Sequence, residues 1–245
     1  MDEREYVMGD HGRVIPLSEF DRSRPGYTRA YFDDGVGLSN YRLGYDKATV
    51  WDQMHPVALL LREYLLPRSV VEFGCAKGVL VGCFRELGVE AVGYDASEYA
   101  VGEADEAVRP YLRVADVASR DATLSFTTAD LAISMEMLEH VPEGDVPTAL
   151  RNIRMATGDW CFLTIHLRDP NAAGPEVLHV DLHDLTHRTL APRAWWNDRL
   201  EEAGFAPAGI MEAVLARDPW IVRNGWKVFL RRPLESGRVA HGARS

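Results

Sequence analysis

The sequence predicts an α/β fold of the doubly wound type, built on parallel strands that are joined by helices. A short apolar run at residues 70–73 (VVEF) follows Pro67 and indicates a buried strand. Glycines at 74 and 78 bracket a tight turn, and a second apolar run at residues 90–95 ends in Asp95. Two parallel strands joined by a helix place this carboxylate beside the glycine turn.

The segment between these strands predicts a helix. Apolar residues repeat there at helical spacing, and Gly88 occupies the position of a C-terminal cap; the repeating residues are Leu80, Cys83, Phe84 and Leu87. A strand, a glycine turn and a helix N-terminus let a ligand approach bare backbone. The turn does not match the GxGxxG dinucleotide motif, because positions 76 and 79 are Ala76 and Val79. Glu72 would repel a pyrophosphate but suits a ligand with an ammonium group.

This acidic-x-Gly-x-x-x-Gly pattern resembles the first motif of the class I S-adenosylmethionine-dependent methyltransferases, and EMLEHVP at residues 136–142 resembles their small-molecule members. The resemblance covers about residues 55–232. It implies a Rossmann-like, doubly wound α/β fold with a mostly parallel seven-stranded sheet, one antiparallel strand and an N-terminal helical cap. It also implies strands at 114–117, 130–135 and 160–165, a helix within 194–204, and a last hairpin of residues 207–216 and 226–231.

The same resemblance implies how the cofactor, S-adenosylmethionine, is held. Glu72 would face its methionine end, Asp95 would bind the ribose, and Asp116 would meet the adenine amino group. The usual second glycine of the turn is Ala76 here, and Lys77 is expected to point to solvent. The expected cofactor-binding residues are Tyr41, Tyr45, Glu72, Gly74, Cys75, Ala76, Gly78, Asp95, Ala96, Asp116, Val117 and Met135.

Three regions are predicted along the chain. Residues 1–54 are dense in aromatic residues and arginines, and we expect them to form a cap or lid over the cofactor. The alternative is that these aromatic residues pack on the sheet or on a partner subunit, which leaves a homodimer open. A helix at 56–66 leads into the core at 55–232, and residues 233–245 form a flexible tail.

Composition limits the class of protein. The 245 residues are 47% hydrophobic, which suits one substantial core and a small appendage. No apolar run reaches membrane-spanning length and no signal peptide is visible. Three cysteines without metal-like spacing indicate reduced thiols in a cytoplasmic protein.

Charge is unevenly distributed. The net charge is −10, and residues 95–145 hold twelve acidic residues and three arginines, a net −9. Such a surface disfavours binding of nucleic acid, because neutralising its phosphates requires a surface where lysines and arginines cluster. It is either a solvated acidic face or a means of attracting a cationic acceptor.

The segment at residues 179–187 contains three histidines and two aspartates. It could bind a divalent metal, recognise substrate, or form a polar structural loop. We favour substrate recognition and expect no metal ligands, because Asp184 and His187 ahead of two tryptophans resemble a segment of natural-product and sugar methyltransferases. The expected substrate-binding residues are Asp169, His183 and Asp184.

The predicted catalytic group is His140, because it follows the fourth predicted strand at the edge where ligands bind. The alternative is that His140 only shapes its loop; His166, His187 and Glu136 are the other candidates. We predict N-methylation of an amino sugar or aminoglycoside in antibiotic biosynthesis. The alternatives are O-methylation of a sugar or polyketide, with or without a metal, and a non-methylating binder of another nucleoside cofactor. No Asn-Pro-Pro-Tyr or Asp-Pro-Pro-Tyr motif occurs, which counts against methylation of an amide or of a base amino group.

Overall fold

The protein is described from a computed structural model, which covers residues 27–33, 44–121, 123–167, 184 and 186–234 together with the backbone of 6–8 and 14–16. The strands are β1 (Tyr6–Met8), β2 (Val14–Pro16), β3 (Ser69–Phe73), β4 (Glu90–Asp95), β5 (Leu112–Val114), β6 (Ala129–Met135), β7 (Thr157–Thr164), β8 (Phe205–Pro207) and β9 (Val228–Pro233). The α-helices are α1 (Arg29–Phe32), α2 (Lys47–Leu65), α3 (Val79–Glu86), α4 (Glu98–Gly102), α5 (Val146–Ala156), α6 (Arg193–Glu202), α7 (Ile210–Leu215) and α8 (Pro219–Arg223). Short 3-10 helices are formed by Arg109–Tyr111, Leu138–His140 and Glu143–Asp145.

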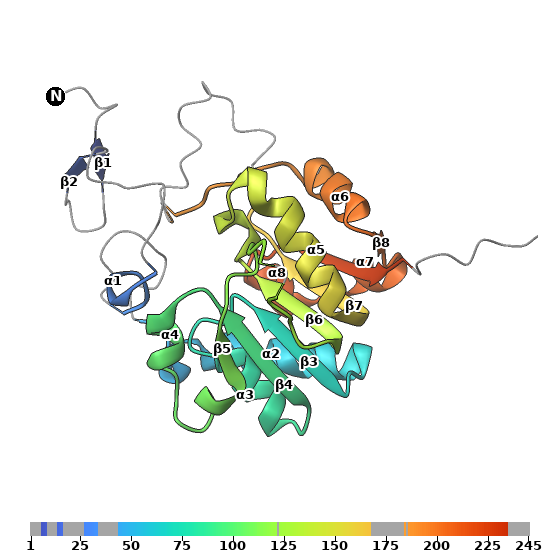
Figure 1. Ribbon diagram of the computed structural model, residues 1–245. Helices are drawn as coiled ribbons and strands as arrows, with labels where there is room; N and C mark the ends of the chain where they lie inside the picture. The colour runs from blue at the N-terminus through green and yellow to red at the C-terminus, as the bar shows by residue number, and fades with distance from the viewer. Residues whose placement is uncertain are drawn as a thin grey trace, which may run out of the picture.

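A seven-stranded sheet in the order β5-β4-β3-β6-β7-β9-β8 forms the centre of the molecule (Figure 1). Strand β9 is antiparallel to both of its neighbours, β7 and β8, and the other pairs are parallel. This confirms the predicted mostly parallel sheet with one antiparallel strand. The chain builds outward from β3 to β5 and then returns to β6 on the other side of β3, so the topological switch lies between β3 and β6.

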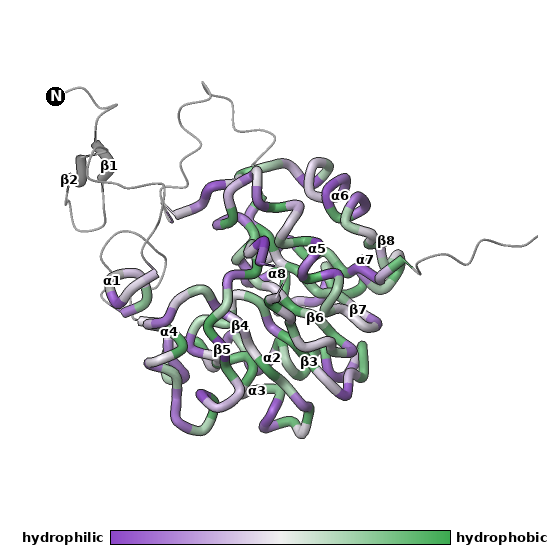
Figure 2. Tube along the Cα trace, viewed as in Figure 1, coloured by the Kyte–Doolittle hydropathy of each residue, from purple (hydrophilic) through white to green (hydrophobic). Residues whose placement is uncertain are grey.

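Apolar side chains on both faces of the central strands give the sheet a core on each face. Val70 belongs to the core with Leu61 of α2 and Leu80 of α3, whereas its neighbour Val71 belongs to the core with Ile153 of α5. Successive side chains of a strand point to opposite faces, so an unbroken apolar run is required where both faces are covered. Figure 2 shows hydrophobic residues along the central strands and hydrophilic ones on the outer helix α6.

One further sequence prediction about the core is confirmed. Helix α3 is followed by Gly88 with φ +76°, as expected for a C-terminal cap. The three cysteines are buried and unbridged. Within the described residues, no helix has the length and apolar character that crossing a bilayer requires.

Helix α2 begins at Lys47, nine residues before the predicted start. A capping box sets this start: the Asp46 side chain accepts from the Thr49 amide (3.1 Å), and the Thr49 hydroxyl oxygen accepts from the Asp46 amide (3.0 Å). Pro56 lies inside the helix rather than at its first turn.

The last hairpin differs from the prediction. Residues 207–216 are not a strand, because the chain leaves β8 and forms α7 and α8 before it enters β9. Gly209 with φ +60° precedes α7, and Pro219 stands in the first turn of α8, where its missing N–H costs nothing. The third strand is also displaced, since β5 ends at Val114 and Asp116 lies in the loop after it.

Candidate active site

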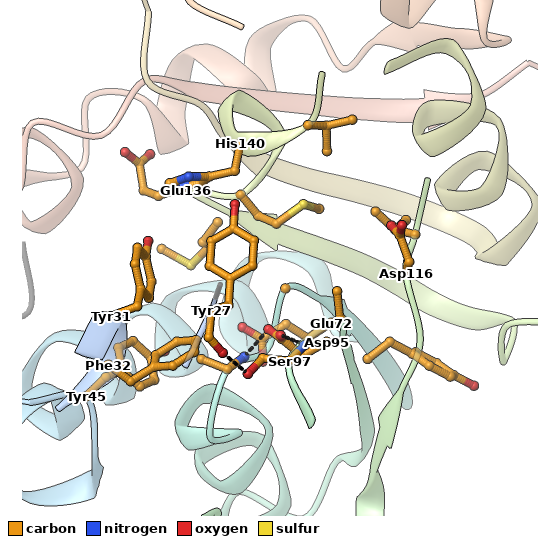
Figure 3. A pocket seen from close by; sticks show the side chains of 18 of the residues that line it. Tyr27, Tyr31, Phe32, Tyr45, Glu72, Asp95, Ser97, Asp116, Glu136 and His140 are labelled. Atoms are coloured by element: carbon orange, nitrogen blue, oxygen red, sulfur yellow. Dashed lines mark hydrogen bonds between the residues drawn. The ribbon is translucent and has the colours of Figure 1, made fainter. Parts of the chain in front are cut away.

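A cavity of about 1320 Å³ opens at the carboxyl ends of β3, β4, β5 and β6. It adjoins the topological switch, where open α/β sheets bind ligands. Its wall has two parts, both visible in Figure 3. The turn side consists of Glu72, Gly74, Ala76, Asp95 and Asp116, and the histidine side of Tyr27, Tyr31, Glu136, His140 and Asp184.

The glycine turn brings backbone to the cavity wall. Gly74 adopts φ +74°, and its amide donates to the carbonyl oxygen of Tyr94 at 2.8 Å. A Cβ atom at Gly74 would lie 2.4 Å from Cγ of Met137, so only glycine fits. Ala76 also has positive φ, +48°, and its amide donates to Oδ2 of Asp95 at 2.8 Å. The turn is therefore tied to the end of β4.

Two carboxyl groups lie on the turn side, that of Glu72 buried and that of Asp95 half-buried. The amides of Ala76 and Ser97 donate to separate oxygens of Asp95, at 2.8 and 2.7 Å. Burial raises the pKa of Asp95, and these two hydrogen bonds oppose the rise. Burial first, and the Asp95 charge second, raise the pKa of Glu72 to about 8. Oε2 of Glu72 is buried without a hydrogen-bond partner among the described residues, so this site suits a ligand with an ammonium group.

The other predicted cofactor residues are distributed as follows. Tyr45, Ala96, Asp116, Val117 and Met135 line the cavity. Cys75 and Gly78 are not part of the wall: the Cys75 side chain packs against Gly93, and Gly78 packs against Leu112. Tyr41 lies outside the described residues.

The segment at residues 27–33 closes one side of the cavity, and hydrogen bonds to Tyr27 and Asp33 attach it to the core. The hydroxyl of Ser97 donates to the carbonyl oxygen of Tyr27 at 2.5 Å. Asp33 accepts from Nζ of Lys77 and from the hydroxyl of Tyr99, each at 2.5 Å. The prediction that Lys77 points to solvent is wrong, since this side chain is only 9% exposed. Its partner Asp33 is 44 positions away in sequence, so no local sequence pattern could indicate this ion pair.

Three histidines meet on the opposite side of the cavity. The ring of His187 lies 4.7 Å from that of His140 and 4.8 Å from that of His166, between ring centroids. Tyr27 packs edge-on to His140 at 6.0 Å, and Tyr31 at 6.3 Å. All three predicted histidines therefore lie in one cluster, and Tyr27 and Tyr31 pack against its member His140.

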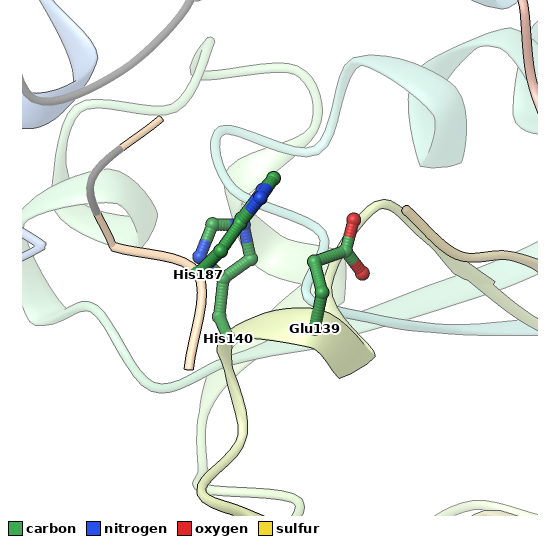
Figure 4. A group of neighbouring side chains, drawn as sticks. All are labelled: Glu139, His140 and His187. Atoms are coloured by element: carbon green, nitrogen blue, oxygen red, sulfur yellow. The ribbon is translucent and has the colours of Figure 1, made fainter. Parts of the chain in front are cut away.

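Acidic residues adjoin this cluster. Glu136 follows β6 with φ +47° and lines the cavity. Glu139 is fully buried; its Oε1 accepts from the His166 amide at 3.1 Å, and its Oε2 has no hydrogen-bond partner among the described residues. Burial, and then the charge of Glu136, raise the pKa of Glu139 well above its usual range. Candidate metal-binding atoms of Glu139, His140 and His187 all lie within 4.8 Å of one another (Figure 4).

Of the predicted substrate-binding residues, only Asp184 is described. It is buried on the histidine side, and its Oδ2 accepts from the Tyr31 hydroxyl at 3.2 Å. Asp169 and His183 lie outside the described residues. No local sequence pattern indicated Ser97 or Thr186, whose hydroxyl groups join distant segments.

Comparisons with known proteins identify the family of this chain and agree with its fold. A family model described as a methyltransferase domain matches residues 50–208. A ubiquinone biosynthesis O-methyltransferase of Methylococcus capsulatus is 31% identical over 109 residues, which are 42% of this chain and 45% of that protein. One from Albidiferax ferrireducens is 27% identical over 128 residues, 49% and 51% of the two chains. The chain spans about half the length of the curated relatives it matches.

Solved structures share the fold. The mitomycin 7-O-methyltransferase MmcR matches 79% of this chain and 56% of its own, with a TM-score of 0.56 and 17% identity. The magnesium protoporphyrin IX methyltransferase ChlM of Synechocystis PCC 6803, with bound SAH, matches 89% and 95% of the two chains, with a TM-score of 0.53 and 16% identity. The family match, the sheet order and the cavity at its switch point lead to one conclusion: this chain belongs to the methyltransferase domain family.

Proposed function

We propose that the protein transfers a methyl group from S-adenosylmethionine to a small polar acceptor. The observation that carries this proposal is one cavity with two chemically different sides, carboxyl groups around a glycine turn on one and a histidine cluster on the other. Glu72 would hold the ammonium group of the cofactor, Asp95 its ribose hydroxyls, and Asp116 its adenine. The bound cofactor would supply an activated methyl group on a good leaving group.

The chain's own contribution is to align the acceptor and to remove its proton. His140 is the proposed base, because it lines the cavity within the cluster of three histidines. Tyr31 and Phe32, 5% and 4% exposed, would shield the reacting groups from water.

The finer proposal is an amine acceptor, such as an amino sugar. The histidine side contains the carboxyl groups of Glu136 and Asp184. Acidic residues at a cleft raise the local concentration of cationic ligands. An ammonium group would also form hydrogen bonds with buried carboxylates, and after losing a proton it becomes the nucleophile.

O-methylation with a bound divalent ion is the second candidate function. It is supported by the cluster of Glu139, His140 and His187 and by the buried Oε2 of Glu139, which has no hydrogen-bond partner in the part of the chain that the structure describes. One carboxylate and two imidazoles are ordinary ligands of first-row metals. The names of the ubiquinone biosynthesis O-methyltransferases also favour an oxygen acceptor.

The fold by itself does not determine the reaction, since the [4+2]-cyclase SpnF matches with a TM-score of 0.52 and 13% identity. Calorimetric titration with S-adenosylmethionine and with nicotinamide dinucleotides tests the cofactor first. Binding of the nicotinamide compounds alone would refute the proposal.

A panel of aminoglycosides, neutral sugars and phenols, assayed for S-adenosylhomocysteine release, tests the acceptor. We expect turnover of the amines, and a lower rate at subsaturating acceptor as salt rises from about 0.01 to 0.5 M. Turnover of phenols or sugars alone would refute the amine proposal. Loss of that turnover in EDTA, and its return with a divalent ion, would establish the second candidate.

A further inference from the structure

Thr186 links two side chains at the histidine side, Asp184 and His140. Its hydroxyl lies 2.6 Å from Oδ1 of Asp184 and 2.8 Å from Nδ1 of His140. Thr186 and Asp184 are 3% and 4% exposed, so water does not compete effectively for these contacts.

The direction of the hydrogen bonds follows from counting protons. The amide of Thr186 donates to Oδ1 of Asp184 at 2.9 Å, and a backbone N–H can only donate, so this oxygen is an acceptor. The Tyr31 hydroxyl donates to Oδ2 of the same carboxylate. An ionised Asp184 has no proton to give, so the single proton of the Thr186 hydroxyl is directed to Oδ1 of Asp184, and a lone pair of the hydroxyl oxygen remains for His140.

This direction fixes the protonation of His140. An oxygen that gives its proton to Asp184 can only accept from His140, so Nδ1 must carry a hydrogen. In a neutral imidazole the lone pair then lies on Nε2, across the ring. The same arrangement orients histidine bases and histidine metal ligands, and the partner of the second nitrogen sets the tautomer.

We infer that Thr186 and Asp184 are positioning residues, which hold His140 with Nδ1 protonated and so present the Nε2 lone pair to the acceptor. This inference rests on the proposed methyltransferase function of the same cavity. It assigns a role to a threonine that neither its residue type nor its place in the sequence indicates.

The test combines a spectrum with kinetics on the full chain. With ¹⁵N-labelled histidine, long-range ¹H–¹⁵N spectra at neutral pH distinguish the two tautomers, and His140→Gln identifies the resonances of His140. We expect the Nδ1-protonated form in the wild type and its loss in Thr186→Val, which keeps the shape but removes the hydroxyl. Thr186→Ser should retain it.

Turnover should follow the spectrum. We expect Thr186→Val to lower kcat by roughly 10- to 100-fold, with the S-adenosylmethionine Kd unchanged, and Thr186→Ser to restore most of the rate. Thr189→Val is the matched control, since this threonine is equally buried in the same segment but donates to the carbonyl oxygen of Val141. Its kcat should stay near that of the wild type.

Two results would overturn the inference: an Nε2-protonated His140 in the wild type, or an unchanged kcat in a folded Thr186→Val variant. Failure of the proposed function would look different, because the wild type would then bind no S-adenosylmethionine while the tautomer could still be read. If Thr186→Val does not fold, the wild-type spectrum decides the question alone.

Discussion

The turn side and the histidine side share one cavity but are built differently. On the turn side, four of the five residues fall between positions 72 and 95, and backbone amides hold Asp95 in place. On the histidine side, contacts join residues far apart in sequence; Tyr31 and Asp184 are separated by 153 positions. The turn side is thus a local backbone motif, whereas the histidine side forms only when distant segments come together. Substitutions on the turn side should therefore change cofactor binding, and substitutions on the histidine side should change turnover of the acceptor.

The largest effect is expected on the turn side, from Gly74→Val. The new side chain would meet Met137 in a backbone conformation that valine avoids, which should cost about 3–5 kcal/mol of folding stability and abolish cofactor binding. Thermal unfolding and calorimetry measure both. Gly88→Val separates the two causes, since Gly88 has φ +76° but open space around it. Wild-type affinity in Gly74→Val would contradict the placement of the cofactor.

Asp95→Ala should have the next largest effect. It removes the acceptor of the Ala76 and Ser97 amides together with the proposed ribose contact. We expect weaker S-adenosylmethionine binding by about 1.5–3 kcal/mol, measured by calorimetry. Asp130→Ala is the control, because Asp130 pairs with the exposed Arg68 and does not line the cavity. An unchanged Kd in Asp95→Ala would place the ribose elsewhere.

Glu72 should make cofactor binding depend on pH. Its raised pKa, about 8, means that the free protein keeps this carboxyl protonated at neutral pH, whereas an ammonium ligand favours the ionised form. Binding then releases a proton, so affinity should increase as pH rises from about 6 toward 8, by at most about tenfold per pH unit.

Calorimetry in two buffers with different ionisation heats measures the released proton. Glu72→Gln should remove both the proton release and the pH dependence of binding. Proton uptake by the wild type would show that the ammonium group lies elsewhere.

The smallest effect should come from the histidine side, in Tyr31→Phe. This change removes one hydrogen bond to Asp184 and should cost about 0.5–1.5 kcal/mol in kcat/KM for the acceptor. The cofactor Kd should not change, which distinguishes the two sides. Tyr64→Phe, at a residue 46% exposed, controls for loss of a tyrosine hydroxyl. Equal losses in cofactor and acceptor binding would show that the two sides are not independent.

The same division explains what the sequence could predict. Strands β3 and β4 and the glycine turn follow from short-range patterns, because apolar runs and glycine positions are local consequences of the backbone. The burial of Lys77 and the role of Thr186 depend on partners from other segments, which no local pattern records. The helices between β8 and β9 were missed because their short apolar stretch allows either strand or helix. The acceptor and the N-methylation remain predictions.

The ion pair of Lys77 and Asp33 has a consequence for how such proteins can be recombined. The lysine belongs to the glycine turn and the aspartate to the segment that closes the cavity, and their side chains are 9% and 24% exposed. A chimera that takes residues 27–33 from a relative but retains this turn would leave an ammonium group enclosed and unmatched, which folded proteins tolerate poorly. Residues 27–33 and the glycine turn should therefore be transferred together when a chimera is made.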